Sequence, residues 1–367
     1  MRPIYPKLVI AGLLLVAGIS LTLALQETED PHDVRLADLS RRGDILHRLD
    51  QVVDWDLFVP PIEQALAKPV AAPGGRPAWH PKVLFKLLVV QRLYNLSDEQ
   101  AEFQLADRLS FQRFVGLTLA DAVPDQNTLW GFREELRKSG VLDRLFALFN
   151  EALRSRGLLP KDGHIVDATF VEVPKQRNSR EENAEIKEGR IPEGWTDDAK
   201  MLGHKDLDAR WTKKNAQSFY GYKNHVKVDA ASKLIESAVV TDAAVHDSQA
   251  LEDLVHSGDR VLYADSAYSG APIAAMLATR DIAPRICEKG TRGHPLTKKQ
   301  MKSNRKKSRV RSRVEHVFAV MSGQAGRVFL RYIGAARTKA AVVMLNLTYN
   351  LLRYEQIIRL DLMPLRT

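Results

Sequence analysis

The chain lacks the residues that build several common kinds of site. It has one cysteine, Cys287, which excludes an intramolecular disulfide framework and a cysteine-rich zinc site. Its ten histidines include no HExxH motif and no paired ligand spacing. No repeat of solenoid period is present along the chain. These absences are typical of a non-repetitive protein of a reducing compartment.

The composition is that of an ordinary globular protein. The chain has 367 residues, enough for two domains, and 45% hydrophobic with 27% charged residues excludes a disordered or fibrous polymer. The 54 Lys and Arg residues exceed the 45 Asp and Glu residues, which leaves a formal net charge of +9. This balance suits a polyanionic partner, although many unrelated proteins share it.

The N-terminal segment 1–30 is hydrophobic and of doubtful function. An uncharged run, Leu8 to Leu25, follows Arg2 and Lys7 and precedes several acidic residues. Three interpretations stay open: an export or anchor signal, a buried helix, or translated sequence upstream of the functional start. Because nothing after residue 30 looks secreted, we expect a cytoplasmic protein translated from a later start, with membrane association left possible by residues 8–25.

From Asp38 to about Leu159 the pattern predicts an all-helical unit. Ser97 with Gln100 forms a capping-box signature, Asp125 is placed to cap a helix, and Gly140 is placed to end it. The Pro- and Gly-rich stretch 68–77 predicts a loop or linker. The aromatic residues of this half are expected in its core: Phe103, Phe111, Phe114, Trp130 and Phe132.

After His164 the pattern changes to that of a mixed α/β region. Short apolar runs predict five strands, and the short link between the second and third predicts an antiparallel hairpin. The charged stretch 175–217 is expected to form a long loop or an inserted excursion, and helices are expected over about 308–321 and 338–357. The five expected strands are Ile165–Val171, Phe219–Val228, Leu234–Val240, Val261–Ala264 and Ile282–Ile286.

Three acidic residues stand out in this region. Asp167 lies inside an apolar strand and Asp265 ends another, where an ionised carboxylate must be paired, hydrogen-bonded or metal-bound. Glu315 borders the apolar stripe of a helix, with Arg311 one turn before it. The ordinary alternatives are that each Asp caps a turn and that Glu315 and Arg311 form a surface ion pair.

A basic segment runs directly into the helix that carries Glu315. Residues Lys289 to Arg313 include eleven Lys or Arg and no acid. Such a run is usually a solvated face or a polyanion-binding arm. Together with three carboxylates it indicates phosphodiester cleavage with two hard divalent cations, which needs oxygen ligands and a cationic surface for the backbone.

These motifs together resemble a known family. The chain is similar to insertion-sequence transposases of the DDE class, specifically the family typified by insertion sequence five. The resemblance covers about residues 33 to 357 and rests on separated motifs in the right order. In the α/β half these are IVDATFV, SFYGYKNHVKVD, VVTDAAVHDSQALEDLV, LYADSAYSG and RSRVEHVFAV, and in the helical half VDWDLFVPPIEQAL, HPKVLFKLLVVQRLYNLSDEQ and DQNTLWGFREEL.

The resemblance implies an α+β architecture and a set of site residues. It implies an all-helical DNA-binding domain over 33–159 and a ribonuclease-H-like α/β catalytic domain over 160–360, with a mixed five-stranded sheet. Asp167, Asp265 and Glu315 are implied as the catalytic, metal-binding triad, with two Mg²⁺ ions and Mn²⁺ as a substitute. The residues implied or expected to contact DNA are Arg311, Arg313, Arg309, Lys307, Lys306 and Arg305.

The implied activity is DNA transposition of a mobile element. Cleavage at the transposon ends frees 3′-hydroxyls, which then attack target DNA. The implied partners are double-stranded DNA, as terminal inverted repeats and target, and a second copy of the chain in a nucleoid-associated homodimer, with no small-molecule substrate. A catalytically inactive, transposase-derived DNA-binding protein is the alternative, because Ser308 and Met321-Ser322 replace a tyrosine and a lysine of the family pattern. A membrane-anchored nuclease is a third hypothesis and rests on residues 8–25 alone.

Overall fold

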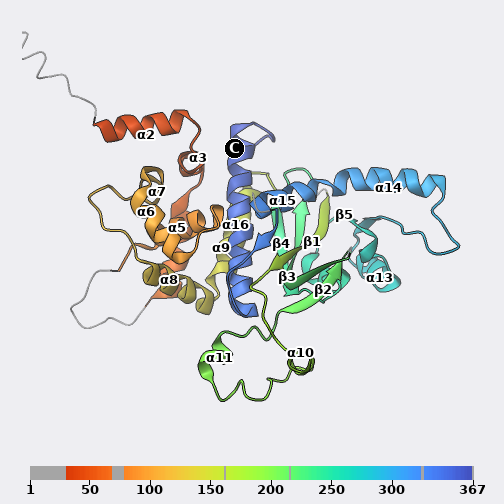
Figure 1. Ribbon diagram of the computed structural model, residues 1–367. Coiled ribbons are helices and arrows are strands. Elements are labelled where there is room, and N and C mark those ends of the chain that lie inside the picture. The colour runs from red at the N-terminus through yellow and green to blue at the C-terminus, as the bar shows by residue number, and fades with distance from the viewer. Residues whose placement is uncertain (1–29, 68–77, 161–162, 215, 324–325, 366–367) are drawn as a thin grey trace, which may run out of the picture. The chain divides into compact units, whose positions relative to one another are not determined.

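The computed structural model describes residues 30–67, 78–160, 163–214, 216–323 and 326–365 (Figure 1). The hydrophobic run 8–25 and the whole expected linker 68–77 therefore lie outside the described residues. Within the described ranges, no helix combines the length and apolar character that a membrane span requires. The chain divides into two units, Met1–Arg48 and Leu49–Thr367. In the first, helix α2 (Pro31–Arg41) begins at Asp30, whose carboxylate accepts the His32 N–H.

In the helical part of the second unit, the capping residues named in the sequence lie at helix ends, as predicted. Ser97 and Gln100 form the expected capping box of α6, Asp125 caps α8, and Gly140 ends α8 in the left-handed conformation. Its elements are the end of α3 (Ile45–Val52), η1 (Trp55–Phe58), α4 (Val59–Leu66), α5 (Pro81–Leu93), α6 (Asp98–Asp107), α7 (Leu109–Val115), α8 (Gln126–Ser139) and α9 (Val141–Ser155).

The prediction that all five aromatic residues are core is wrong for two of them. Phe111, Phe114 and Phe132 are buried, but the side chains of Phe103 and Trp130 are 69% and 49% exposed. Both lie on helix faces that the packing of α6 and α8 leaves to solvent, so aromatic character alone did not identify the buried face.

A mixed sheet forms the α/β half, which confirms the expected fold class. Its order is β2-β3-β1-β5-β6, with β4 on β3 and β7 on β1. β3 pairs antiparallel with β1, β2 and β4, whereas β5 and β7 pair parallel with β1, and β6 parallel with β5. The strands are β1 (His164–Glu172), β2 (Arg210–Lys214), β3 (Gln217–Asp229), β4 (Ile235–Asp242), β5 (Val261–Ala264), β6 (Ala283–Ile286) and β7 (Val328–Phe329).

The sheet has seven strands rather than five. All five expected strands are present, and the additional ones are β2 and β7. The stretch 175–217 is not one long loop, because it contains α10 (Arg180–Lys187), α11 (Ala199–Gly203) and β2. The strand β2 has the polar sequence RWTKK, and β7 has two residues, so neither carries a hydrophobic strand pattern.

Helices cover both faces of the sheet. One face packs against α15 (Arg313–Ser322) and α16 (Ala335–Arg359) through a core that includes Ile165 and Val317. The other packs against α12 (Leu251–Leu254) and α13 (Ala271–Thr279) through a core that includes Val166. The short helices η2 (Asp247–Ala250) and η3 (Ser266–Tyr268) flank this second face, and α14 (Lys298–Arg311) precedes α15.

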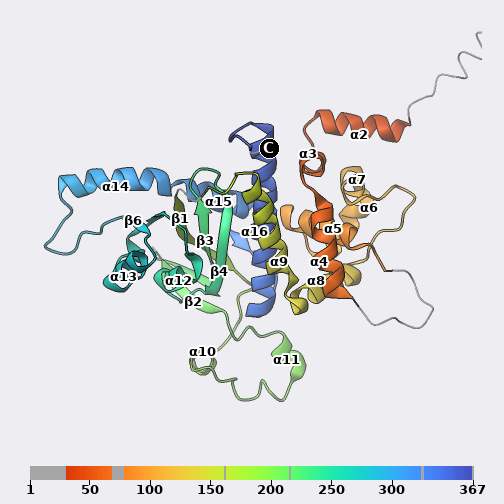
Figure 2. The ribbon, with the colours of Figure 1, turned by 180° about the vertical axis from the view of Figure 1, so that it is seen from behind.

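The long helix α16 lies between the sheet and the helices α5 and α9 (Figures 1 and 2). It is about 37 Å long at 1.5 Å per residue. Asn346 exchanges hydrogen bonds with Asn224 of β3, and Asn350 bonds both the backbone of Ile235 on β4 and Asn150 of α9. Because these amides are buried and paired, α16 is held to both layers in one register.

Gly221 of β3 provides a test of the central strand pairing. Its φ is +140°, and a Cβ at this position would lie 2.3 Å from the Val171 carbonyl oxygen of β1. We expect Gly221→Ala to lower the free energy of unfolding by about 1–3 kcal/mol, because the strands must separate locally. Urea denaturation measures this. In the control Gly131→Ala, the new methyl in α8 meets no atom within 4 Å and should not destabilise; equal midpoints for both variants contradict the prediction.

Candidate active site

The parallel pairing of β1 with β5 sets Asp167 and Asp265 level with each other. His164 pairs with Leu262 and Ile165 with Tyr263, so the same register continued by two residues places Asp167 opposite Asp265. Asp265 follows the last residue of β5 and accepts the Ala267 N–H at 2.8 Å, as a cap of η3. On the same edge, β1 pairs next with β7 at Val171, so Asp167 lies between the two parallel partners.

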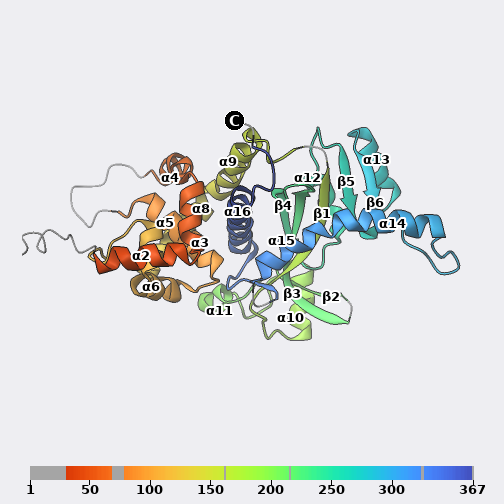
Figure 3. The same cartoon turned by 90° about the horizontal axis from the view of Figure 1, so that it is seen from above.

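Glu315 comes from α15, on the face of the sheet that Asp167 shares. Val314, Val317 and Met321 form the buried stripe of α15, and Glu315 lies off this stripe with a side chain that is 61% exposed. The expected single helix over 308–321 is wrong, because α14 ends at Arg311 and α15 begins at Arg313. Ser312 is the junction, and Figure 3 shows α14 and α15 following one another along the sheet edge.

Arg311 joins two of the three carboxylates. Its Nη1 lies 2.6 Å from Asp167 Oδ2 and 3.8 Å from Glu315 Oε1. Burial raises the pKa of Asp167 to about 6; the charges of Asp265 and Glu315 add to this, while the Ala168 N–H and Arg311 oppose it. The three acids, which are far apart in the sequence, therefore act on one another electrostatically in the fold.

Tyr268 is a residue of this site that the sequence reasoning missed. It is fully buried in η3, and its hydroxyl has no hydrogen-bond partner among the described residues. Burial raises the pKa of Tyr268 well above its ordinary value, and the charges of Asp167, Asp247 and Asp265 reinforce the shift. The signal was available, because Tyr268 follows Asp265 by three residues within the motif LYADSAYSG.

The basic segment is an ordered helix over most of its length. A capping box of Thr297 and Gln300 begins α14, and Asn304 exchanges two hydrogen bonds with the backbone of Glu288. None of the residues of α14 is buried. The helix therefore extends from α15 as a cationic surface (Figure 1).

The six residues expected to contact DNA differ in their surroundings. Arg305, Lys306 and Arg309 are exposed and form no ion pair with a described carboxylate. Lys307 donates to the Ile286 carbonyl, and Arg313 donates to the Ala230 carbonyl. With Arg311 bound to Asp167, three of the six are held by the sheet and three are available to a partner.

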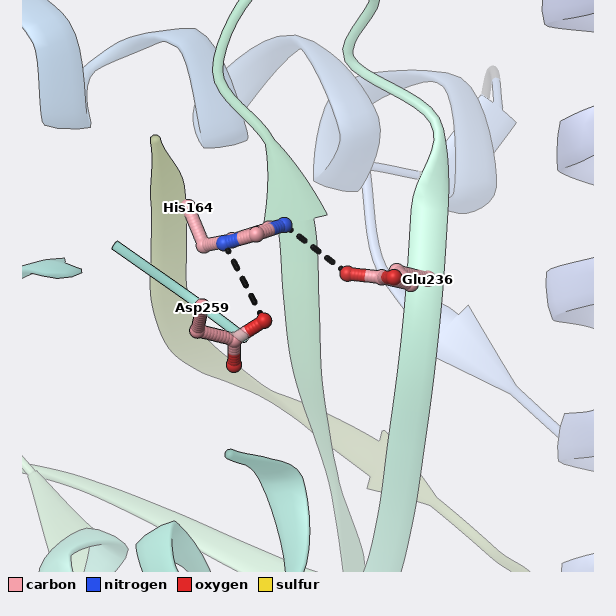
Figure 4. Close-up of side chains that lie close together, drawn as sticks. All are labelled: His164, Glu236 and Asp259. Atoms are coloured by element: carbon pink, nitrogen blue, oxygen red, sulfur yellow. Dashed lines mark ion pairs between the residues drawn. The ribbon is translucent and has the colours of Figure 1, made fainter. Parts of the chain in front are cut away.

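A second cluster of metal-ligating residue types lies at the start of β1. Among the described residues, His164, Glu236 and Asp259 offer ligand atoms that all lie within 4.8 Å of one another, and the candidate triad does not meet this spacing. Figure 4 shows the imidazole of His164 between the two carboxylates, 2.8 Å from Glu236 and 3.5 Å from Asp259.

A lysine already neutralises this cluster. The buried Lys227 ammonium lies 2.8 Å from Asp259 Oδ2 and 3.2 Å from Glu236 Oε2, and Arg154 pairs with Glu236 from outside. A divalent ion there would bring further positive charge against a buried ammonium. We therefore interpret the cluster as a buried ion-pair network that holds β1, β3 and β4 together.

Comparison with known proteins agrees with the motifs. A family model described as "Transposase DDE domain" matches residues 159–351, and one described as "Transposase domain (DUF772)" matches residues 34–135. Among solved structures, the chain is similar to a piggyBac transposase in a synaptic complex with hairpin DNA, at 12% identity and a TM-score of 0.44, over 88% of this chain and 77% of that one. The family matches support transposase function, DNA binding and use of a divalent metal; the insertion-sequence-five assignment stays a prediction.

The ion-pair network predicts sensitivity of the fold to acid. Burial opposes ionisation of Glu236, but the hydrogen bond from His164 and the charge of Lys227 outweigh it and hold the pKa of Glu236 well below its ordinary value. A carboxylate with a lowered folded-state pKa stabilises the fold fully above its unfolded pKa of about 4.3, and this contribution is lost as the pH falls through the folded value.

We therefore expect the Tm of the wild-type chain to fall from pH 6 to pH 3 more steeply than that of Glu236→Gln, which should already be less stable at pH 7. Thermal denaturation across this pH range measures both slopes. Glu151→Gln is the matched control, because Glu151 pairs with the same Arg154 but is 69% exposed. Parallel curves for wild type and Glu236→Gln contradict the assignment.

Proposed function

Because the chain belongs to the DDE transposase family, we propose that Asp167, Asp265 and Glu315 hold two Mg²⁺ ions and catalyse transposon-end cleavage and strand transfer. The observation that supports the proposal is the electrostatic interaction of Asp167 on β1 with Asp265 after β5 and Glu315 on α15, beside an exposed cationic helix. The freed 3′-hydroxyl would attack a phosphodiester of target DNA, which breaks one P–O bond for each one formed.

The donor set suits hard divalent cations. All three side chains offer carboxylate oxygens, which Mg²⁺ prefers, and Mn²⁺ accepts the same ligands. A pair of such ions is proposed because phosphodiester cleavage places charge on both the attacking and the leaving oxygen. When bound, such ions lower the pKa of the attacking hydroxyl and stabilise the leaving oxygen.

The neighbouring side chains have separate tasks in this proposal. Arg311 offsets the charge of Asp167 and Glu315, and its guanidinium can pair with a DNA phosphate once cations take over that role. Tyr268 keeps its proton, and its hydroxyl has no partner among the described residues, so we propose that it donates a hydrogen bond to a group bound at the site. We propose that Arg305, Lys306 and Arg309 contact the backbone of double-stranded DNA, with Lys307 and Arg313 fixing the helix beneath it.

The assembly follows from the reaction. Transposition joins two inverted-repeat ends to target DNA, and each end needs an active site, so we propose a nucleoid-associated homodimer in the synaptic complex. The helical domain over 33–159 is proposed to read the inverted repeats and residues 160–360 to cut them. The hydrophobic segment 1–30 is given no part in the reaction.

Removal of one carboxylate tests the triad. We expect Asp167→Asn, Asp265→Asn and Glu315→Gln each to reduce cleavage of end-bearing supercoiled plasmid by at least roughly a hundredfold, because a lost ligand removes charge stabilisation from the transition state. Gel analysis of plasmid nicking with Mg²⁺ measures this, and a chelator should abolish the wild-type signal.

The control is Glu181→Gln, an exposed carboxylate in α10, which should cut normally. A triad variant that keeps wild-type cleavage is removed from the proposed site. DNA binding by the wild type without cleavage under any metal condition favours the inactive DNA-binding alternative.

Neutralising the exposed side of α14 tests the DNA-binding surface. We expect the triple variant Arg305→Gln, Lys306→Gln, Arg309→Gln to bind duplex DNA more weakly. The slope of log affinity plotted against log salt concentration should become shallower by about three, one for each lost phosphate contact. Anisotropy titrations over a series of KCl concentrations measure the slope. The control variant neutralises Lys138, Lys187 and Lys200, which are exposed on other helices; equal effects of both triple variants indicate net charge alone.

A further inference from the structure

Two cavities meet at Arg92, close to the C-terminal end of α5. One, of about 510 Å³, lies between this end of α5, the last residues of α15 and the strand β7. The other, of about 430 Å³, lies between α5, α8, the end of α11 and the segment that leads into α16. Arg92 lines both cavities, so its guanidinium is a shared wall between them.

The second cavity has more positive than negative side chains. Four arginines line it, and two of them are neutralised: Arg133 forms a two-pronged ion pair with Asp98, and Arg337 pairs with Glu134. Arg92 and Arg331 remain without a carboxylate partner among the described residues, although Arg331 donates to the oxygen atoms of Asn95. Burial lowers the pKa of Arg92, and the charges of Arg133 and Arg331 lower it further.

Arg92 is a half-buried guanidinium that has no carboxylate partner among the described residues, and this arrangement favours the binding of an anion. Arg92 and Arg331 line the same cavity and act on one another electrostatically, and a phosphate group accepts several N–H donors at once from such a pair of guanidinium groups. The exposed indole of Trp130 lines the same cavity and offers an apolar face to a sugar or base. The first cavity is also lined by Arg327, which pairs with Glu172 at 3.5 Å, so Arg92 is the arginine of that cavity without a carboxylate partner among the described residues.

The cavities lie in line with the candidate active site. Glu315 is in the first turn of α15, and Val320 to Gly323 at the other end of α15 line the first cavity. Ser322 lies seven residues after Glu315 on the same helix, a distance of about 10 Å. Figure 3 shows α14 and α15 leading toward α16, so a strand of DNA that follows them past the carboxylates reaches the end of α15 next.

We propose that Arg92 and Arg331 form a second phosphate-binding site, which holds the DNA backbone a few nucleotides away from the phosphodiester that is cut. This proposal rests on the proposed function, because it takes α14, the carboxylates and the cavities as one path for a bound strand. With one phosphate per 3.4 Å along a strand, the distance of about 10 Å from Glu315 to Ser322, at the wall of the first cavity, spans about three nucleotides. The site would fix the position of the DNA without reading its sequence.

The test is binding of a 30-base-pair duplex of mixed sequence, measured by anisotropy without divalent metal over a series of KCl concentrations. We expect the double variant Arg92→Gln, Arg331→Gln to bind at least roughly tenfold more weakly at 100 mM KCl and to lose about two from the salt slope. The charge-conserving Arg92→Lys, Arg331→Lys variant should recover part of the affinity. Arg144→Gln is the control, since Arg144 is an exposed arginine of α9 that bonds only Gln64 among the described residues.

Circular dichroism and the Tm establish that each variant is folded. Wild-type affinity and slope in the folded double variant overturn the proposal. A second arm measures the Tm in inorganic phosphate. If phosphate raises the Tm of the wild type but not that of the double variant, while both proteins bind the duplex equally well, the cavity binds a free anion. This outcome also overturns the proposal. Because the assay needs no cleavage, weaker binding by the double variant supports the phosphate site even if the wild-type protein does not cut DNA. An unaffected duplex affinity, in turn, does not change the result of the triad experiment.

Discussion

The Arg311–Asp167 ion pair is the contact on which the arrangement of the site depends. Three carboxylates of like charge cannot gather at a buried strand without positive charge beside them, and Arg311 supplies it from the last residue of α14. Arg311 contacts Asp167 at the end of α14, and the chain continues into α15 after Ser312. As a result Val314 and Val317 pack on the sheet while Glu315 is exposed. This bond to the central strand therefore acts together with the Lys307 and Arg313 hydrogen bonds to position the cationic helix and the acid on α15.

Local signals in the sequence were enough to predict most elements. The caps at Ser97, Asp125 and Gly140 act through groups within three or four residues, so their pattern is visible without the fold. The five apolar strands were predicted for the same reason. By contrast, β2 is held by pairing with β3 rather than by burial, and its exposed Trp211 with two lysines gives no alternation to read. The expectation that Phe103 and Trp130 are buried was wrong, because burial depends on whether another helix packs on that face, which the sequence does not show.

The candidate site was readable only in part. An acid within an apolar strand and another at the end of a strand are unusual enough to single out Asp167 and Asp265, and the parallel register then accounts for their proximity. Glu315 alone resembled a surface ion-pair residue; its position at the border of an apolar helix stripe and the adjoining basic segment singled it out, and the family resemblance implied its metal-binding role. Tyr268 and the Lys227 network escaped notice because burial, which the sequence does not display, gives them their significance: a buried hydroxyl near the acids, and a buried ammonium between Glu236 and Asp259.

The position of α16 in the chain has a consequence for biosynthesis. This helix completes the core of the sheet and also packs on α5 and α9, yet it is the last of the described helices to leave the ribosome. Until it emerges, Asn224, Ile235 and Asn150 have no amide partners from it, and two apolar layers remain open to water. Nascent chains and fragments that stop before residue 335 are therefore expected to need chaperones or to be degraded, so that only a full-length product supplies working protein.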